Sequence, residues 1–244
     1  MLKPKLSVVI PAYNEGSRIA LTLEDVDKYL KAQKYSYEII VVDNGSNDNT
    51  CNVVKEYQEK GVEKVVRLCL EKSIGAKGSA VKLGIFEYAQ GDYVVFMDAD
   101  NATPISEIEK FWPYFDKGYS VVIGSRYVTD SNVTRKQPFY RIILSRASNL
   151  LIQAVAVPGI HDTQLGFKGF RGEAAKNIFS KVTIPGWGFD MEVLTIAKIQ
   201  GYKIKEVGVL WHERGGSHVP LGAYIQSLKD LFKIKIGALT GKYK

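Results

Sequence analysis

The chain has 244 residues, of which 45% are hydrophobic, so it can form one large α/β domain or two small ones. No apolar run of about 18 residues is present, so no membrane-spanning helix is predicted. The strand expected from Leu6 leaves no room for a signal peptide. Cys51 and Cys69 predict no disulfide framework, and we interpret them as small core residues in a reducing, cytoplasmic setting.

The net charge of +7 is unevenly distributed along the chain. Residues 1–125 carry 15 lysines and arginines against 18 acidic residues, whereas residues 126–244 carry 18 against 8. A basic half predicts an anionic partner, which is a phosphorylated substrate, an anionic membrane surface or a nucleic acid. Since the sequence has no zinc-finger, homeodomain or RNP pattern, we expect no nucleic-acid partner.

The first half alternates strands with helices, which predicts a mostly parallel, doubly wound, Rossmann-like sheet with helices on both faces. Apolar runs predict strands at residues 6–10, 37–42, 64–70, 93–97 and 119–123. Helical spacing of apolar residues predicts helices at residues 17–30, 50–60, 80–89 and 105–115. Glycines and prolines separate these segments and support the boundaries.

The second half has fewer clear elements. Residues 135–157 form a basic amphipathic stretch that predicts either a core-packed helix or an interfacial helix on a membrane. Trp187 and Phe189 lie between glycines and predict either a core turn or a platform that faces a sugar. We expect a helix to Gln200, a strand at 202–210 and a polar loop at 211–218. The basic, amphipathic tail at 221–244 predicts either a membrane-surface segment or a helix packed on the domain.

Two carboxylates follow the central strand. Asp98 and Asp100 lie one residue apart where the 93–97 strand leaves the sheet, and they would repel each other unless a cation lies between them. Mg²⁺ or Mn²⁺ suits such oxygen ligands and often also binds substrate phosphates. The alternative interpretation is a solvated, aspartate-rich turn.

The other predicted strands also end in polar residues, and the carboxyl ends of parallel strands share one edge of a sheet. That edge collects three aspartates, a lysine and an arginine, an arrangement typical of a nucleotide site. The strand ends concerned are Pro11–Glu15, Asp43, Gly75–Gly78 with Lys77, Asp98 with Asp100, and Ser125 with Arg126.

Several motifs together resemble glycosyltransferase family 2 on a GT-A fold. They are the segments at residues 8–15, 41–46 and 75–78, with Asp98-Ala99-Asp100 similar to the family's D-x-D motif. In the second half, segments 124–126, 162–168 and 187–192 look most like the dolichyl-phosphate β-glucosyltransferases, with the dolichol-phosphate mannose synthases close behind. The resemblance implies a single GT-A domain over residues 1–244. Within it, residues 1–125 bind the nucleotide-sugar, 126–218 bind the acceptor and 219–244 form the basic amphipathic segment.

The resemblance also implies a UDP-glucose or GDP-mannose donor, a polyprenyl phosphate acceptor and a peripheral position on the cytoplasmic face of a membrane. Asp98 and Asp100 are implied as metal ligands, with Lys77 and Arg126 near phosphates. Ala102 stands where mannose synthases often carry a metal-binding glutamine, which weakens the mannose interpretation. The remaining donor-site residues implied in this way are Pro11, Ala12, Tyr13, Glu15, Asp43, Gly75 and Ala99.

The expected reaction is a single displacement at the anomeric carbon that inverts its configuration. A phosphate acceptor needs no general base, because it is already anionic near neutral pH. It needs positive charge, for which the candidates are Arg126, Arg135, Arg141, Arg146 and Lys168. Asp162 is a candidate base, acceptor-orienting group or arginine partner, and we favour the orienting role.

Three alternatives remain at this stage. One is a family 2 transferase with a hydroxyl acceptor in polysaccharide or cell-wall synthesis. The second is a sugar nucleotidyltransferase, although its Gly-rich, Arg-containing loop is not found. The third is a non-catalytic protein that binds nucleotide-sugars. The three histidines lack paired spacing, so no zinc site is expected.

Overall fold

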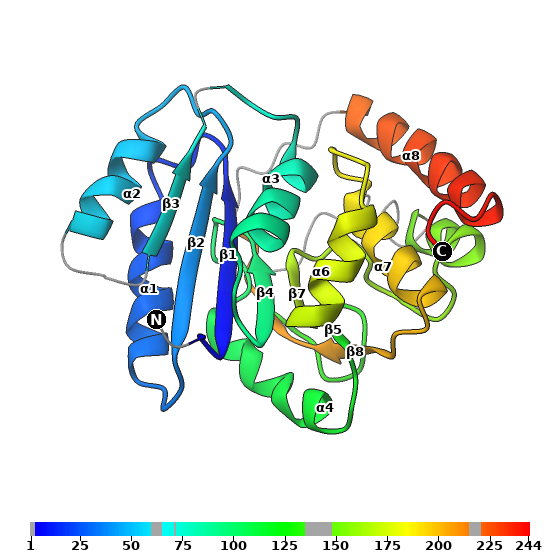
Figure 1. Ribbon diagram of the computed structural model, residues 1–244, viewed down its shortest axis with the longest axis horizontal. Helices are drawn as coiled ribbons and strands as arrows, with labels where there is room; N and C mark the ends of the chain where they lie inside the picture. Colours follow the sequence, from blue (N-terminus) through cyan, green and yellow to red (C-terminus); the bar gives the residue numbers. More distant parts are fainter. Residues whose placement is uncertain (1–2, 60–64, 71, 135–147, 215–220) are drawn as a thin grey trace.

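The computed structural model describes residues 3–59, 65–70, 72–134, 148–214 and 221–244. A seven-stranded sheet runs through the molecule (Figure 1), and a two-stranded ribbon lies beside it. The ribbon pairs β6 (Asn132–Val133) with β9 (Leu210–Trp211). The order across the large sheet is β3 (Val65–Cys69), β2 (Tyr37–Asp43), β1 (Leu6–Ala12), β4 (Tyr93–Met97), β7 (Phe167–Arg171), β5 (Val121–Ser125) and β8 (Ile204–Gly208).

All strands of the large sheet except β7 run in the same direction. β7 pairs antiparallel with β4 on one side and with β5 on the other. The second half of the chain therefore enters the middle of the sheet formed by the first half. The predicted mostly parallel α/β sheet is confirmed, and the antiparallel insertion of β7 is a feature that the sequence pattern did not give.

The strands are buried on both faces because their apolar side chains alternate between two cores. In β1, Val8 and Ile10 pack on one face and Val9 on the other. In β4, Val95 packs on the same face as Val8, and Phe96 packs on the same face as Val9. This period of two is what a sheet covered by helices on both sides requires.

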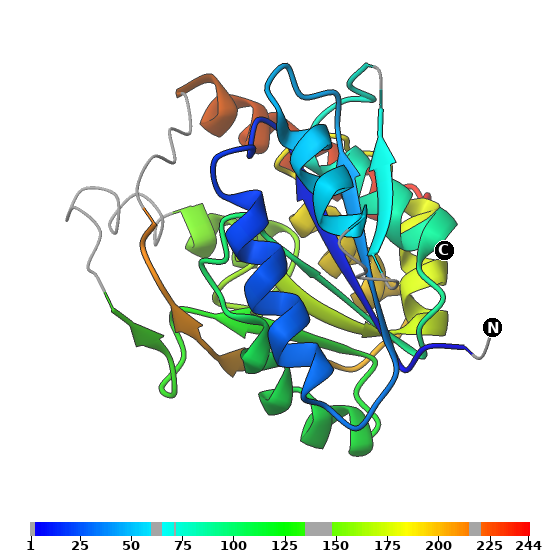
Figure 2. The same cartoon turned by 90° about the vertical axis from the view of Figure 1, so that its left-hand side faces the viewer.

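Helices cover each face of the sheet, as Figures 1 and 2 show. One face carries α1 (Ile19–Lys31), α2 (Thr50–Glu59), the 3₁₀ segment η2 (Ile105–Lys110) and α4 (Trp112–Asp116). The other carries α3 (Lys77–Leu83), the π-helical segment η1 (Gly84–Tyr88), α6 (Gly172–Lys181), α7 (Phe189–Ile199) and α8 (Leu221–Leu239). A further helical stretch spans residues 148–155. Among the helices of the described residues, none combines the length and apolar character needed to cross a bilayer.

Three predicted boundaries were wrong for local reasons. β1 continues through Pro11 and Ala12, because β4 pairs with β1 only as far as Val9 and the absent proline N–H costs no ladder bond there. The helix expected from Ala80 already begins at Lys77. The helix expected at 105–115 splits into η2 and α4, since Pro113 lacks the N–H that a continuous helix needs.

The interpretation of the two cysteines was also wrong. Cys51, at the start of α2, and Cys69, at the end of β3, form a disulfide, and both side chains are only partly buried. The bond joins α2 to β3, an edge strand of the sheet. Two cysteines 18 residues apart give no pairing signal in the sequence, because only the fold brings their Cα atoms to 5.8 Å.

Reduction of this disulfide is expected to lower the free energy of unfolding by about 3 kcal/mol, the loop-closure entropy of a cross-link of this span. Denaturant unfolding of the protein with and without a phosphine reductant measures the difference. A Cys51→Ser/Cys69→Ser double variant is the control and should show no reductant effect. Equal stability of oxidised and reduced wild-type protein would contradict the cross-link.

Candidate active site

Polar residues gather at the carboxyl edge of the sheet, as the order of strands predicted. β2 ends at Asp43, β4 leads directly into Asp98 and Asp100, and β5 leads into Arg126. These strands run parallel, so their ends lie along one edge. α3 brings Lys77 to the same edge, where its ammonium meets Asp98.

Asp98 is held from two sides. The Lys77 Nζ lies 2.5 Å from the Asp98 Oδ1. The Asp98 backbone N–H donates to the Gly166 carbonyl at 3.1 Å, and a side chain at Gly166 would run into the Asp98 carboxylate. Burial by itself lowers the pKa of Lys77, but the charges of Asp98 and Asp190 outweigh it, so that pKa is raised and the lysine stays charged.

Asp100 lacks such a cationic partner among the described residues. Its Oδ1 accepts a hydrogen bond from the Ala102 backbone N–H at 3.0 Å. Burial and the nearby Asp98 charge raise the pKa of Asp100, and the Ala102 hydrogen bond and the charges of Arg18 and Lys77 only partly oppose this. Negative charge is therefore left uncompensated at the end of β4.

The residues present fit a divalent metal ion. Two carboxylates that disfavour each other's charge, supplied as oxygen ligands, are the donor set that Mg²⁺ and Mn²⁺ prefer. The next residue, Asn101, adds a buried Oδ1 with no hydrogen-bond partner in the described parts of the chain. Its backbone has φ = 53°, a conformation that asparagine tolerates better than most residues, and it turns the chain sharply after the aspartates.

The loops beside the carboxylates are fixed to one another. The buried Asn44 donates through Nδ2 to the Gly75 carbonyl at 3.1 Å and accepts from the Ile74 N–H at 3.0 Å. The Asp43 Oδ1 accepts from the backbone N–H of Ser46 at 3.1 Å. Asn44 was not predicted as a site residue, although its place directly after a strand end was a usable signal.

The segment after β1 presents its residues in different ways. Pro11 and Ala12 are buried within the strand, whereas the Tyr13 ring is 52% exposed at the edge. Glu15 is occupied by the Arg18 guanidinium, which bonds both of its oxygens. The hydrogen bond to Glu15 raises the pKa of Arg18, with smaller contributions from Asp100 and Asp98. Arg18 therefore adds a cation near the carboxylates that was not predicted from the sequence, although its i,i+3 spacing to Glu15 was visible.

Arg126 and Asp162 form a buried ion pair. The Asp162 side chain is fully buried and accepts from the Arg126 backbone N–H at 3.0 Å, from Nε at 2.8 Å and from Nη2 at 2.9 Å. Burial raises the pKa of Asp162, but the Arg126 charge and hydrogen bonds outweigh it, so the net pKa is lowered. Of the three roles considered for Asp162, this geometry matches the arginine partner.

Lys168 does not reach the acceptor side, so its assignment to an acceptor phosphate was wrong. It is fully buried in β7, and its Nζ donates to the Asp190 Oδ1 at 2.5 Å and to the Leu165 carbonyl at 2.6 Å. A charge sealed in this way cannot meet a phosphate. The other acceptor candidates, Arg135, Arg141 and Arg146, lie outside the described residues.

The two aromatic residues between glycines have separate roles. Phe189 is fully buried and packs against Phe96, with 5.7 Å between the ring centroids. Trp187 is 46% exposed, and the Lys77 Nζ lies 5.6 Å from the centroid of its ring. The core-turn interpretation therefore holds for Phe189, and Trp187 lies beside the Lys77–Asp98 pair.

Comparison with known proteins shows to which family this chain belongs. Residues 7–179 match the model for glycosyl transferase family 2. The chain belongs to glycosyltransferase family 2. It is 39% identical to a dolichyl-phosphate beta-glucosyltransferase of Dictyostelium discoideum, an alignment that covers 98% of this chain and 76% of that protein. It is 37% identical to the human protein of that name, over 98% of this chain and 78% of the relative.

Solved structures support the GT-A fold. Glucosyl-3-phosphoglycerate synthase of Mycobacterium tuberculosis, crystallised with Mn²⁺, UDP-glucose and phosphoglyceric acid, is similar with a TM-score of 0.68. The identity is 19%, over 96% of this chain and 79% of that one, so this likeness concerns the fold alone. The family and fold resemblance stated from the motifs is confirmed.

Replacing Asp98 or Asp100 of this glycosyltransferase should change its free energy of unfolding in opposite directions. A carboxyl group whose pKa is higher in the folded state destabilises that state increasingly as the pH rises from the unfolded value, 3.8 for Asp100, through the folded one. Asp100→Asn is therefore expected to stabilise the metal-free protein at pH 7. Asp98→Asn should destabilise it by about 1 kcal/mol, because the mostly buried Lys77 loses its partner.

Thermal unfolding of both variants with and without Mn²⁺ tests this expectation. Mn²⁺ should stabilise the wild-type protein and leave the Asp100→Asn variant unchanged, and transfer activity in that variant should fall about 100-fold or more. A destabilised Asp100→Asn variant that still responds to Mn²⁺ would contradict the metal assignment.

Removal of the Asp162 carboxylate should be costly for stability. Asp162→Ala leaves the Arg126 charge largely buried without its partner, and the expected loss is about 3 kcal/mol. Because the folded pKa of Asp162 is below its ordinary value, the stabilisation is present at neutral pH and is lost as the pH falls through that lowered pKa. Denaturant unfolding between pH 7 and pH 3 measures both effects, with Asp130→Ala, an exposed aspartate, as the control.

Proposed function

We propose that this glycosyltransferase moves glucose from UDP-glucose to dolichyl phosphate or a similar polyprenyl phosphate, with inversion at the anomeric carbon. The observation that carries the proposal is the 39% identity, over nearly the whole chain, to a protein named dolichyl-phosphate beta-glucosyltransferase. The polar edge of the sheet supplies groups that suit this reaction.

Donor binding is assigned to the loops that follow β1, β2 and β4 and to the start of α3. Tyr13 and Asp43 would contact the base and ribose, and Lys77 would meet the diphosphate. Pro11, Ala12, Glu15, Gly75 and Ala99 line the same edge and shape its backbone. Asp98 and Asp100 would hold Mg²⁺ or Mn²⁺, and the bound ion would supply charge that offsets the leaving diphosphate.

The acceptor phosphate attacks the anomeric carbon as an oxygen nucleophile while the bond to UDP breaks. No residue must remove a proton, because a monoester phosphate is already ionised at neutral pH. This agrees with Asp162, whose carboxylate is engaged by Arg126 and whose lowered pKa makes it a poor base. Arg126, held near Asp98 with 17% of its side chain exposed, is assigned to phosphate oxygens. Arg135, Arg141 and Arg146 remain acceptor candidates on sequence alone.

We assign the protein to the cytoplasmic surface of a membrane, and helix α8 supports the contact with a membrane surface. Its inner face packs into the core through Leu231 and Ile234. Its outer face exposes Ile225, Leu228, Phe232, Ile236 and Leu239, each by 43–76%. Exposed Lys229, Lys233 and Lys235 flank this apolar stripe. An apolar stripe bordered by lysines suits an anionic lipid surface.

A transfer assay with labelled UDP-glucose, GDP-mannose or UDP-N-acetylglucosamine tests the proposal. Purified protein with Mn²⁺ and polyprenyl phosphate should give organic-phase label from UDP-glucose alone, and chelator or Asp100→Ala should abolish it. Label from GDP-mannose instead would reassign the donor. Donor hydrolysis without lipid label would point to a hydroxyl acceptor and overturn the proposed substrate.

The membrane contact is tested in the same assay. A Phe232→Ser/Ile236→Ser variant should lose at least about tenfold in transfer to acceptor embedded in anionic vesicles, since two large apolar side chains no longer enter the lipid. Transfer to a short-chain, water-soluble polyprenyl phosphate is the matched control and should be unchanged. An equal loss with both acceptors would contradict a role for α8 at the membrane.

A further inference from the structure

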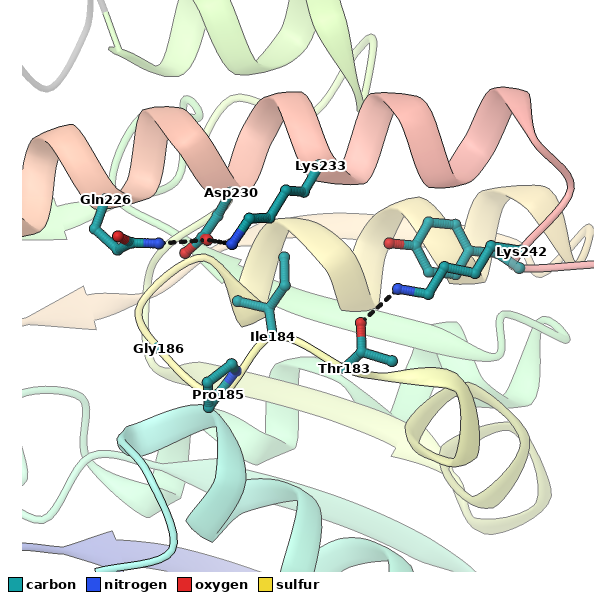
Figure 3. Close-up of a pocket in the computed structure, with 9 residues that line it drawn as sticks. Thr183, Ile184, Pro185, Gly186, Gln226, Asp230, Lys233 and Lys242 are labelled. Atoms are coloured by element: carbon teal, nitrogen blue, oxygen red, sulfur yellow. Dashed lines mark hydrogen bonds and ion pairs between the residues drawn. The ribbon is translucent and has the colours of Figure 1, made fainter.

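A short segment, residues 183–187, lies between α8 and the start of α3 (Figure 3). On one side the Pro185 carbonyl accepts from the Ser79 N–H at 3.2 Å. A side chain at Gly78 would come within 2.8 Å of the Ile184 carbonyl. On the other side, a side chain at Gly188 would lie 2.6 Å from the Asp230 Cβ of α8. The segment thus connects the C-terminal helix α8 with the start of α3, which carries Lys77.

One buried carboxylate holds this segment. The Glu192 Oε2 accepts from the backbone N–H groups of Thr183 at 2.8 Å and Ile184 at 2.7 Å. Its Oε1 accepts from the Thr183 Oγ1 at 2.8 Å and from the Tyr243 Oη at 2.9 Å. Glu192 is fully buried, so no water competes for these bonds. Burial, followed by the hydrogen bond to Glu192, raises the pKa of Tyr243.

On the α8 side, Ile184 of the segment is buried in the core, but part of this side is open. A cavity of about 410 Å³ lies there, lined by Thr183 to Gly186 of the segment and by residues of α8 and the C-terminal turn. An open cavity supplies no van der Waals contacts to fix a backbone. The hydrogen bonds of Glu192 and the Lys242 Nζ bond to the Thr183 Oγ1 at 2.7 Å therefore position the segment together with the buried Ile184 side chain.

The segment ends in Trp187, next to the donor site. The Lys77 Nζ lies 5.6 Å from the Trp187 ring centroid and 2.5 Å from the Asp98 Oδ1. A displacement of residues 183–186 would move Trp187 and would loosen the start of α3 at Ser79. Both changes act on Lys77, the cation assigned to the donor diphosphate.

We propose that Glu192 is a positioning residue for donor binding. Tyr243 supports this role by donating a hydrogen bond to the second oxygen of the Glu192 carboxylate. Glu192 fixes residues 183–187 against α3, which holds Trp187 and Lys77 at the donor site. Tyr243, 51 residues further along the chain, makes the C-terminal turn part of the donor site. The inference rests on the proposed function only in assigning Lys77 to a sugar-nucleotide donor.

The test compares Glu192→Gln and Tyr243→Phe with the control Tyr202→Phe. Tyr202 also loses a hydroxyl hydrogen bond, in which its Oη accepts from the Asn177 Nδ2 at 3.0 Å, away from residues 183–187. The position of Trp187 is followed by fluorine NMR of protein labelled with 5-fluorotryptophan, which gives three tryptophan signals. Trp187→Phe assigns the relevant signal. Calorimetry gives the affinity for UDP with Mn²⁺, and steady-state kinetics give KM for donor and acceptor and kcat.

Glu192→Gln is expected to shift or broaden the Trp187 signal before any ligand is added, and to weaken UDP binding about tenfold. Tyr243→Phe should show the same pattern with about a threefold loss, and Tyr202→Phe should match the wild-type protein. KM for the donor should rise, while KM for the acceptor stays unchanged.

A purely structural role would lower the unfolding temperature and leave the Trp187 signal and UDP affinity at wild-type values, which would overturn the proposal. An equal change in Tyr202→Phe would also overturn it. If the wild-type protein binds UDP but transfers no glucose to lipid, the proposed function is wrong, while the fluorine signal and UDP affinities still decide the role of Glu192. If it binds no UDP, the Trp187 signal alone decides that role.

Discussion

Two carboxylates at the end of a buried strand are the constraint on which this active site depends. β4 is covered on both faces, so its direction is fixed and it delivers Asp98 and Asp100 to the same place. Lys77 neutralises Asp98, but the charge of Asp100 remains largely unbalanced in a mostly buried position. The protein therefore keeps an electrostatically unfavourable site that a divalent cation would relieve, which is typical of functional sites.

The second half of the chain supplies part of the active site that the first half forms. β7 enters between β4 and β5, and its leading turn places the Gly166 carbonyl on the Asp98 backbone N–H. The buried Lys168–Asp190 pair lies behind that turn and ties β7 to α7. A buried pair of this kind contributes more to a defined arrangement than to net stability, because desolvation offsets most of its attraction. The boundary at residue 125 therefore separates two halves of the sequence, while the site draws on both.

The sequence predicted where the central residues of this candidate site lie, for a physical reason. Parallel strands buried on both faces show as continuous apolar runs, and the residue after each run must lie at the shared edge. This reasoning placed Asp43, Asp98, Asp100 and Arg126 correctly from position alone. The choice of Lys168 for its positive charge was wrong, because a lysine within a short strand looks the same in sequence whether its ammonium faces solvent or a buried aspartate. The interpretation of Cys51 and Cys69 was also wrong, because their approach depends on how α2 packs against β3.

The sequence by itself determined the fold class, the carboxylate pair at the end of the central strand and the basic, amphipathic character of the C-terminal segment, because these depend on local pattern and on strand order. Only the tertiary structure decided which charges neutralise each other. The pairs Lys77–Asp98, Arg126–Asp162 and Lys168–Asp190 join residues 21, 36 and 22 positions apart. The bonds of Glu192 to Thr183 and Tyr243 likewise appear only once α7 and the C-terminal turn have packed. The physical reason is that the strength of a charged contact depends on distance and burial, and both are properties of the folded chain.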